Sequence, residues 1–127
     1  MTRAMLPAPR RFAAAGLLAG ILAAWQHPAL AHAIIIDSTP AVNAAVAGPD
    51  VDVRLHFNSR IDQKRSRLTL IGRDDKATPV AVTPDEAPDM LTGRAAGIAP
   101  GQYRLRWQVL AVDGHITRGD IPFTVSH

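Results

Sequence analysis

The stretch Gly101–Val125 constrains the fold more than any other part of the sequence. Its first half alternates apolar residues with arginine and glutamine, and the apolar positions are Tyr103, Leu105, Trp107 and Val109. After a break the alternation returns at Ile121, Phe123 and Val125. A period of two is typical of a β-strand with one buried face. The stretch therefore predicts two strands joined by a short connection.

Asp113-Gly114-His115 lies in that connection and carries the first candidate chemistry. A carboxylate and an imidazole two residues apart, in a glycine-containing turn, predict half of a metal site. Asp-Gly is also a common turn dipeptide in proteins without metals. The motif therefore needs further ligands from elsewhere in the chain.

The chain before this stretch also reads as short strands. Val51–Asn58 alternates clearly, and three consecutive isoleucines, Ile34–Ile36, predict a short buried strand that stops at Pro40. Weaker strands are predicted around Leu68–Leu70, Val80–Val82 and Met90–Thr92, and Ala41–Pro49 is expected to be a small-residue connection. No segment keeps a helical period. Short strands separated by proline and glycine predict an all-β sandwich or barrel of six or seven strands.

Residues 1–31 have the features of a secretory signal peptide. Arg3, Arg10 and Arg11 precede an apolar run, Phe12–Trp25, and Ala29-Leu30-Ala31 supplies small residues for the peptidase. The run is short for a membrane span of about 20 residues. We expect cleavage after Ala31 and one domain over 32–127. Cleavage after Ala33 and export by either the general or the twin-arginine route stay open.

Cleavage after Ala31 changes the charge and leaves little sulfur. It removes three of the 14 Lys and Arg residues and none of the 11 acids, so the mature formal charge is 11 − 11 = 0. No basic patch with interleaved aromatic residues remains, which argues against a nucleic-acid partner. The chain has no cysteine, and Met90 is the only methionine after residue 31. Soft sulfur ligands are therefore nearly absent.

His32 would become the first residue of the mature protein. Its α-amine and imidazole would then chelate one cation, because both donors belong to one residue. With Asp113 and His115 the set becomes an amine, two imidazoles and a carboxylate, which favours Cu(II) in tetragonal geometry. Zn(II) could use the same ligands tetrahedrally. His56, on the polar side of a predicted strand, is expected to be a solvated surface residue, and His127 ends the chain.

Several motifs together resemble the CopC family of periplasmic copper-resistance proteins. They are His32-Ala33, Ser38-Thr39-Pro40-Ala41, the Val51–Phe57 strand, and a C-terminal block made of Gly101, Tyr103, Leu105, Trp107, Asp113-Gly114-His115, Gly119, Phe123 and Val125. The resemblance implies a seven-stranded Greek-key barrel or sandwich, cupredoxin-like or immunoglobulin-like. It also implies one Cu(II) per chain, bound by His32, Asp113 and His115. A periplasmic monomer is expected, with an inner-membrane copper transporter of the CopD type as possible partner.

The sequence departs from the family pattern at two places. Family members with a Cu(I) site have a methionine-rich loop, whereas Thr83–Pro100 offers only Met90, so we expect no Cu(I) site. The family strand that ends in phenylalanine is usually followed by a glutamate that supports the copper site. Here Phe57 precedes Asn58 and Ser59, and either of these could take the place of that glutamate.

Two other functions compete with copper sequestration or delivery. An N-terminal histidine that chelates copper also occurs in oxidases of polysaccharides, which need an exposed, commonly aromatic platform. The aromatic residues after residue 31 fall at positions that should face the core. The second alternative is a metal-free β-sandwich that serves as an interaction module. We expect a copper-binding protein that is not an enzyme.

Overall fold

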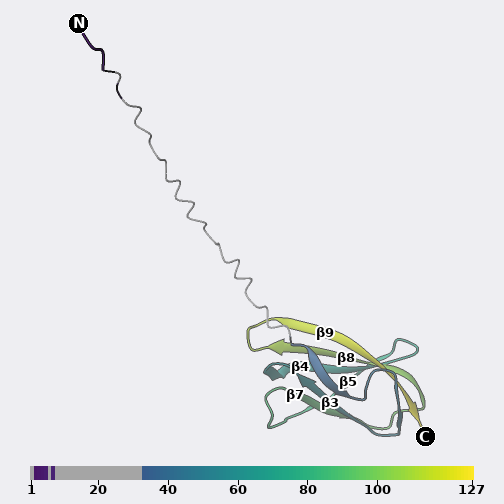
Figure 1. Cartoon of the computed structure of the whole chain (residues 1–127). Coiled ribbons are helices and arrows are strands. Elements are labelled where there is room, and N and C mark those ends of the chain that lie inside the picture. Colours follow the sequence, from purple (N-terminus) through teal and green to yellow (C-terminus); the bar gives the residue numbers. More distant parts are fainter. Residues whose placement is uncertain (1, 6, 8–32) are drawn as a thin grey trace.

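The computed structural model describes residues 2–5, 7 and 33–127 (Figure 1). Most of the predicted signal peptide, and His32, lie outside the described residues, so the domain boundary stays a prediction. Residues 33–127 contain nine strands: β1 (Ile35–Thr39), β2 (Ala44–Ala47), β3 (Val51–Phe57), β4 (Ile61–Gly72), β5 (Ala77–Val80), β6 (Val82–Thr83), β7 (Met90–Ala95), β8 (Gly101–Ala111) and β9 (Ile116–Ser126). In the described part of the chain, no helix is long and apolar enough to cross a membrane.

The strands form two sheets, which confirms the predicted all-β class. One sheet has the order β1-β3-β7-β6 and the other has the order β2-β9-β8-β4-β5. Neighbouring strands are antiparallel except for β2, which pairs in parallel with β9. The longest strands, β4, β8 and β9, lie side by side in the second sheet. Two of them, β8 and β9, flank the turn that joins them.

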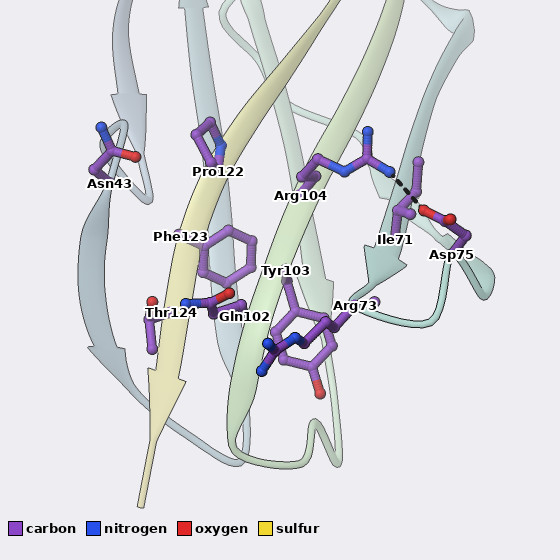
Figure 2. Close-up of a pocket in the computed structure, with 11 residues that line it drawn as sticks. Asn43, Ile71, Arg73, Asp75, Gln102, Tyr103, Arg104, Pro122, Phe123 and Thr124 are labelled. Carbon is purple, nitrogen blue, oxygen red and sulfur yellow. Dashed lines mark hydrogen bonds and ion pairs between the residues drawn. The ribbon is translucent and has the colours of Figure 1, made fainter.

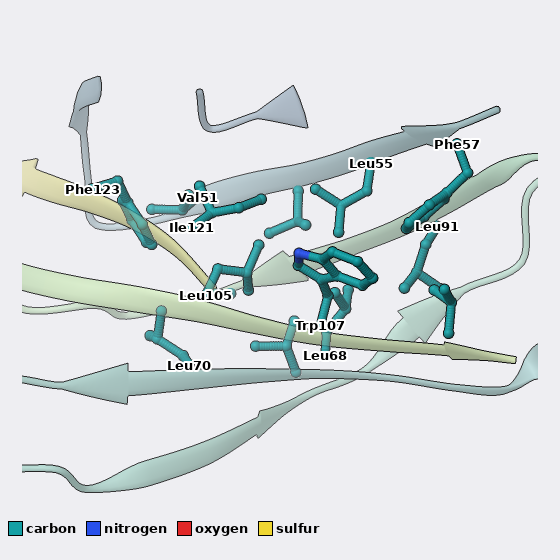
Figure 3. Packing of buried hydrophobic residues seen from close by; sticks show 14 of the residues in the cluster. Val51, Leu55, Phe57, Leu68, Leu70, Leu91, Leu105, Trp107, Ile121 and Phe123 are labelled. Carbon is teal, nitrogen blue, oxygen red and sulfur yellow. The ribbon is translucent and has the colours of Figure 1, made fainter. Parts of the chain in front are cut away.

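The core lies between the two sheets and follows the alternation in the sequence. On β3, Val53, Leu55 and Phe57 are buried, whereas the residues between them face outward. Phe57 is 1% exposed and meets the Trp107 ring edge-on, with 5.4 Å between ring centroids (Figure 3). Burying one such side chain contributes about 1.5–3 kcal/mol. The period-two pattern therefore identified the core correctly on both sheets.

One predicted connection and one predicted strand differ from the structure. Ala41–Pro49 contains β2, which is formed by alanine and valine and pairs with the edge of β9. Its partner lies far away in the sequence, so no local pattern marks it. The weak strand predicted around Val80–Val82 is two strands in different sheets, because β5 pairs with β4 and β6 pairs with β7.

The prediction that Ile34–Ile36 is buried was wrong for two of its three residues. Ile34 is 58% exposed and Ile36 is 59% exposed. The cause is that β1 is an edge strand, and its register with β3 shifts between Ile35 and Asp37. Only Ile35 packs against the core.

Candidate metal centre

The turn between β8 and β9 carries the two candidate ligands that the structure describes. It spans residues 112–115 and is closed by backbone hydrogen bonds from Ala111 N to His115 O and from Gly114 N to Ala111 O. Gly114 has φ of 88°, a left-handed conformation that glycine adopts without the strain of a Cβ atom. The sequence Asp-Gly-His therefore has a conformational reason for its glycine.

Asp113 and His115 contact each other within this turn. Nδ1 of His115 lies 3.0 Å from Oδ2 of Asp113, and the backbone N–H of His115 donates to Oδ1 of Asp113 over 3.0 Å. The backbone N–H of His115 and then its side chain lower the pKa of the Asp113 carboxyl below its usual value. Both side chains keep contact with solvent, at 31% and 48% exposure. They offer an ionised carboxylate and an imidazole on one small surface.

The domain begins at the same end of the sandwich as this turn (Figure 1). Ala33 is fully buried in the core. Ile34 forms two hydrogen bonds with Asn58, which follows β3 directly. Three residues later Ile61 pairs with Ala111, the last residue before the turn. The described part of the domain therefore begins, at Ala33, at the end of the sandwich that carries Asp113 and His115.

His32, the third predicted ligand, lies outside the described residues. Among the residues that the structure does describe, no group of three or more His, Cys, Asp or Glu side chains could hold a metal ion. The prediction assigned two protein ligands to this turn, and the structure places both of them, Asp113 and His115, in contact there. The described residues fit half of a metal site.

His56 lies elsewhere and has its own partner. It faces outward from β3, and its Nε2 lies 2.8 Å from Oδ2 of Asp89. His56 is part of a shallow hollow on the outer side of the first sheet, together with Asp37 and Met90. The expectation of a solvated surface histidine was only partly correct, because the imidazole is half-buried and bonded to a carboxylate that the sequence did not indicate. His127, at the C-terminal end of the sequence, has its Nε2 3.1 Å from the carbonyl oxygen of Ile98.

A hollow of about 500 Å³ lies at the opposite end of β8 (Figure 2). Tyr103 and Arg104 line it, and Arg104 bonds Asp75 over 3.1 Å. Ala111, the last residue of β8 before the turn, lies eight positions after Tyr103, which corresponds to roughly 26 Å of strand. The residues that line this hollow include no histidine, so it is separate from the candidate metal centre.

Two buried hydroxyl groups, those of Ser59 and Thr117, lie close in sequence to Asn58 and His115. Ser59 directly follows Asn58, and Thr117 is two residues after His115. Neither atom has a hydrogen-bond partner among the described residues. Buried polar atoms normally have partners.

Residues 33–127 thus form a small two-sheet β-protein with a carboxylate–imidazole pair on a turn at one end. The profile of the CopC domain matches residues 35–126. The chain belongs to the CopC family.

Individual relatives agree with this assignment. "Copper resistance protein C" of Escherichia coli is 30% identical over 118 residues, which cover 86% of this chain and 93% of the relative. The crystal structure of CopC from Methylosinus trichosporium OB3b superposes with a TM-score of 0.70 at 28% identity, and covers 75% of this chain and 94% of its own. PcoC from Escherichia coli, described as a methionine-rich copper resistance protein, gives a TM-score of 0.62 at 30% identity, with 76% and 100% coverage.

Proposed function

We propose that this protein binds one Cu(II) ion in the periplasm through His32, Asp113 and His115. The α-amine and imidazole of His32 would supply two donors, and the turn between β8 and β9 would supply the other two. The observation that carries the proposal is the Asp113–His115 pair, 3.0 Å apart, at the end of the sandwich where the described domain begins at Ala33. Copper is the cargo of the protein.

The donor chemistry supports Cu(II) over Cu(I). Nitrogen and carboxylate donors suit Cu(II), whereas Cu(I) prefers thiolate and thioether ligands. The chain has no cysteine, and Met90, its only methionine after residue 31, is buried on β7. PcoC, by contrast, is described as methionine-rich. We therefore propose no Cu(I) site.

The protein acts in copper resistance or homeostasis, by sequestering copper or delivering it. We also propose that the protein is a monomer and that its partner is an inner-membrane copper transporter of the CopD type. A polysaccharide oxidase is disfavoured by the aromatic residues among residues 33–127. Phe57, Trp107 and Phe123 are buried, and the Tyr103 ring packs against the core, so they form no exposed platform. We propose that the protein is not an enzyme.

The first test is the intact mass of the exported protein, which distinguishes a chain that starts at His32 from one that starts at Ile34. The second is a copper titration followed by EPR, with one tetragonal Cu(II) per chain as the expected result. His115→Ala should weaken binding strongly. His56→Ala is the matched control, because its imidazole binds Asp89 away from the turn, and it should leave the copper affinity unchanged. A chain that starts at Ile34, or equal loss in both variants, would contradict the proposal.

A further inference from the structure

Asn58 and Ile34 are joined by a reciprocal pair of hydrogen bonds. The backbone N–H of Ile34 donates to Oδ1 of Asn58 over 2.9 Å, and the backbone N–H of Asn58 donates to the carbonyl oxygen of Ile34, also over 2.9 Å. The two residues are 24 positions apart in the sequence. One bond uses the Asn58 side chain and the other uses only its backbone.

This pair lies just beyond the end of a strand ladder. The pairing of β1 with β3 ends at Ile35 and Phe57, so Ile34 precedes the first residue of β1. The Asn58 amide oxygen accepts the Ile34 N–H at the point where the regular pairing stops. It thereby extends the fixed part of the chain by one residue toward residue 32.

The neighbouring residues hold the same segment in place. Ala33 is fully buried, and Phe57, directly before Asn58, is one of the most deeply buried large side chains. Asn58 itself is exposed, so its side chain contributes little to the core. The Asn58 side chain instead holds the backbone of Ile34 through its hydrogen bond.

We propose that Asn58 is a positioning residue for the copper site, because it holds the backbone two residues after His32. This inference rests on the proposed function. A ligand at a free chain terminus must lose conformational entropy when it binds a metal, and a terminus that is already ordered loses less. Asn58 would thus raise copper affinity without touching the ion.

The test uses three variants of the mature protein that starts at His32. Asn58→Ala removes the acceptor for the Ile34 N–H, and Asn58→Asp keeps an acceptor there. Gln63→Ala is the control, because the Gln63 side chain likewise bonds backbone groups of a loop, in this case those of Asp85 and Ala87. Two quantities are measured: Cu(II) affinity by competition with a chelator, and hydrogen exchange of the Ile34 amide by NMR without metal.

Asn58→Ala should weaken Cu(II) binding about five- to tenfold, as expected for the loss of one hydrogen bond that orders a ligand. It should also speed Ile34 amide exchange by a similar factor. Asn58→Asp should bind copper at least as well as wild type, and Gln63→Ala should keep wild-type affinity even if it unfolds more easily.

Unchanged copper affinity in Asn58→Ala would overturn the inference, as would unchanged Ile34 exchange. Equal weakening in Asn58→Ala and Gln63→Ala would also overturn it, since that result would mean general destabilisation. If wild type bound no copper, or if His115→Ala bound it as well as wild type, the proposed function would fail instead. The Ile34 exchange measured without metal separates these two failures.

Discussion

Gly119 on β9 lies directly opposite Trp107 on β8, and the two are in contact. A methyl group on the Cα of Gly119 would come within 2.6 Å of Cζ2 of the Trp107 ring. Trp107 is buried, and its ring also meets Phe57 edge-on. The absence of a side chain at residue 119 therefore leaves room for the Trp107 ring beside β9, the strand that follows the Asp113–His115 turn.

Gly119→Ala should destabilise the protein by about 1–3 kcal/mol, the usual cost of overpacking a filled core. Urea unfolding followed by Trp107 fluorescence measures this directly, because Trp107 is the only tryptophan after residue 31. Thr124→Ala is the matched control, on the same strand at an exposed position. A change below about 0.5 kcal/mol in Gly119→Ala would show that the indole moves aside without strain.

Thr117→Val should stabilise the protein by about 1 kcal/mol. Thr117 Oγ1 is buried without a hydrogen-bond partner among the described residues, and valine has the same shape without the cost of a desolvated hydroxyl. Thermal unfolding of the mature protein provides the measurement. A lower stability would mean that this hydroxyl has a partner outside the described residues.

The sequence predicted the parts of the fold that depend on local patterns. Alternation identified β3, β8 and β9, because a strand with one buried face must place apolar residues at every second position. It did not identify β2, whose small residues pair with β9 about 80 positions away. It also misjudged Ile34 and Ile36, because hydrophobicity alone does not reveal that β1 lies at the edge of its sheet.

The candidate site also has a part that the sequence predicted and a part that it did not. Asp113 and His115 were predicted because both lie in one glycine-containing turn. The bond between Ile34 and Asn58 and the bond between His56 and Asp89 join residues 24 and 33 positions apart. Such contacts depend on how the sheets pack, so the sequence offered Asn58 and Ser59 only as alternatives. Among the described residues, the Asn58 side chain has a hydrogen-bond partner and the Ser59 hydroxyl has none.

Asp120→Asn should lower the free energy of unfolding at neutral pH. It should also make that free energy fall less steeply as the pH is lowered. Arg106 forms two hydrogen bonds with Asp120, at 2.9 and 3.0 Å, and lowers the pKa of Asp120 below its usual value near 3.8. A lowered folded-state pKa stabilises the protein above the unfolded-state value, and this stabilisation is lost as pH falls through the folded-state pKa. The pair is partly exposed, so the loss at pH 7 should be about 0.5–1 kcal/mol.

Urea unfolding at pH 7 and below pH 4 would test this, and the gap between wild type and Asp120→Asn should narrow at the lower pH. Added salt should also narrow it. Glu86→Gln is the control, since it removes the same charge at an exposed position in the loop before β7. A gap that stayed constant over this pH range would contradict a role for the Asp120 charge.

Adding one residue in front of His32 should weaken Cu(II) binding by at least about tenfold. The extension turns the α-amine of His32 into an amide, so the chelate loses one nitrogen while both imidazoles and the Asp113 carboxylate remain. Loss of a hydrogen-bond partner of a metal ligand already costs about 10–100-fold in affinity, so the loss of a ligand should cost at least as much.

The measurement is chelator competition with EPR, on chains with a defined first residue. One residue added after His127 is the matched control, because that extension leaves both the α-amine and the Asp113–His115 turn unchanged. Equal affinity in the two extended chains would mean that the α-amine is not a ligand, and copper would then have to be held by side chains alone.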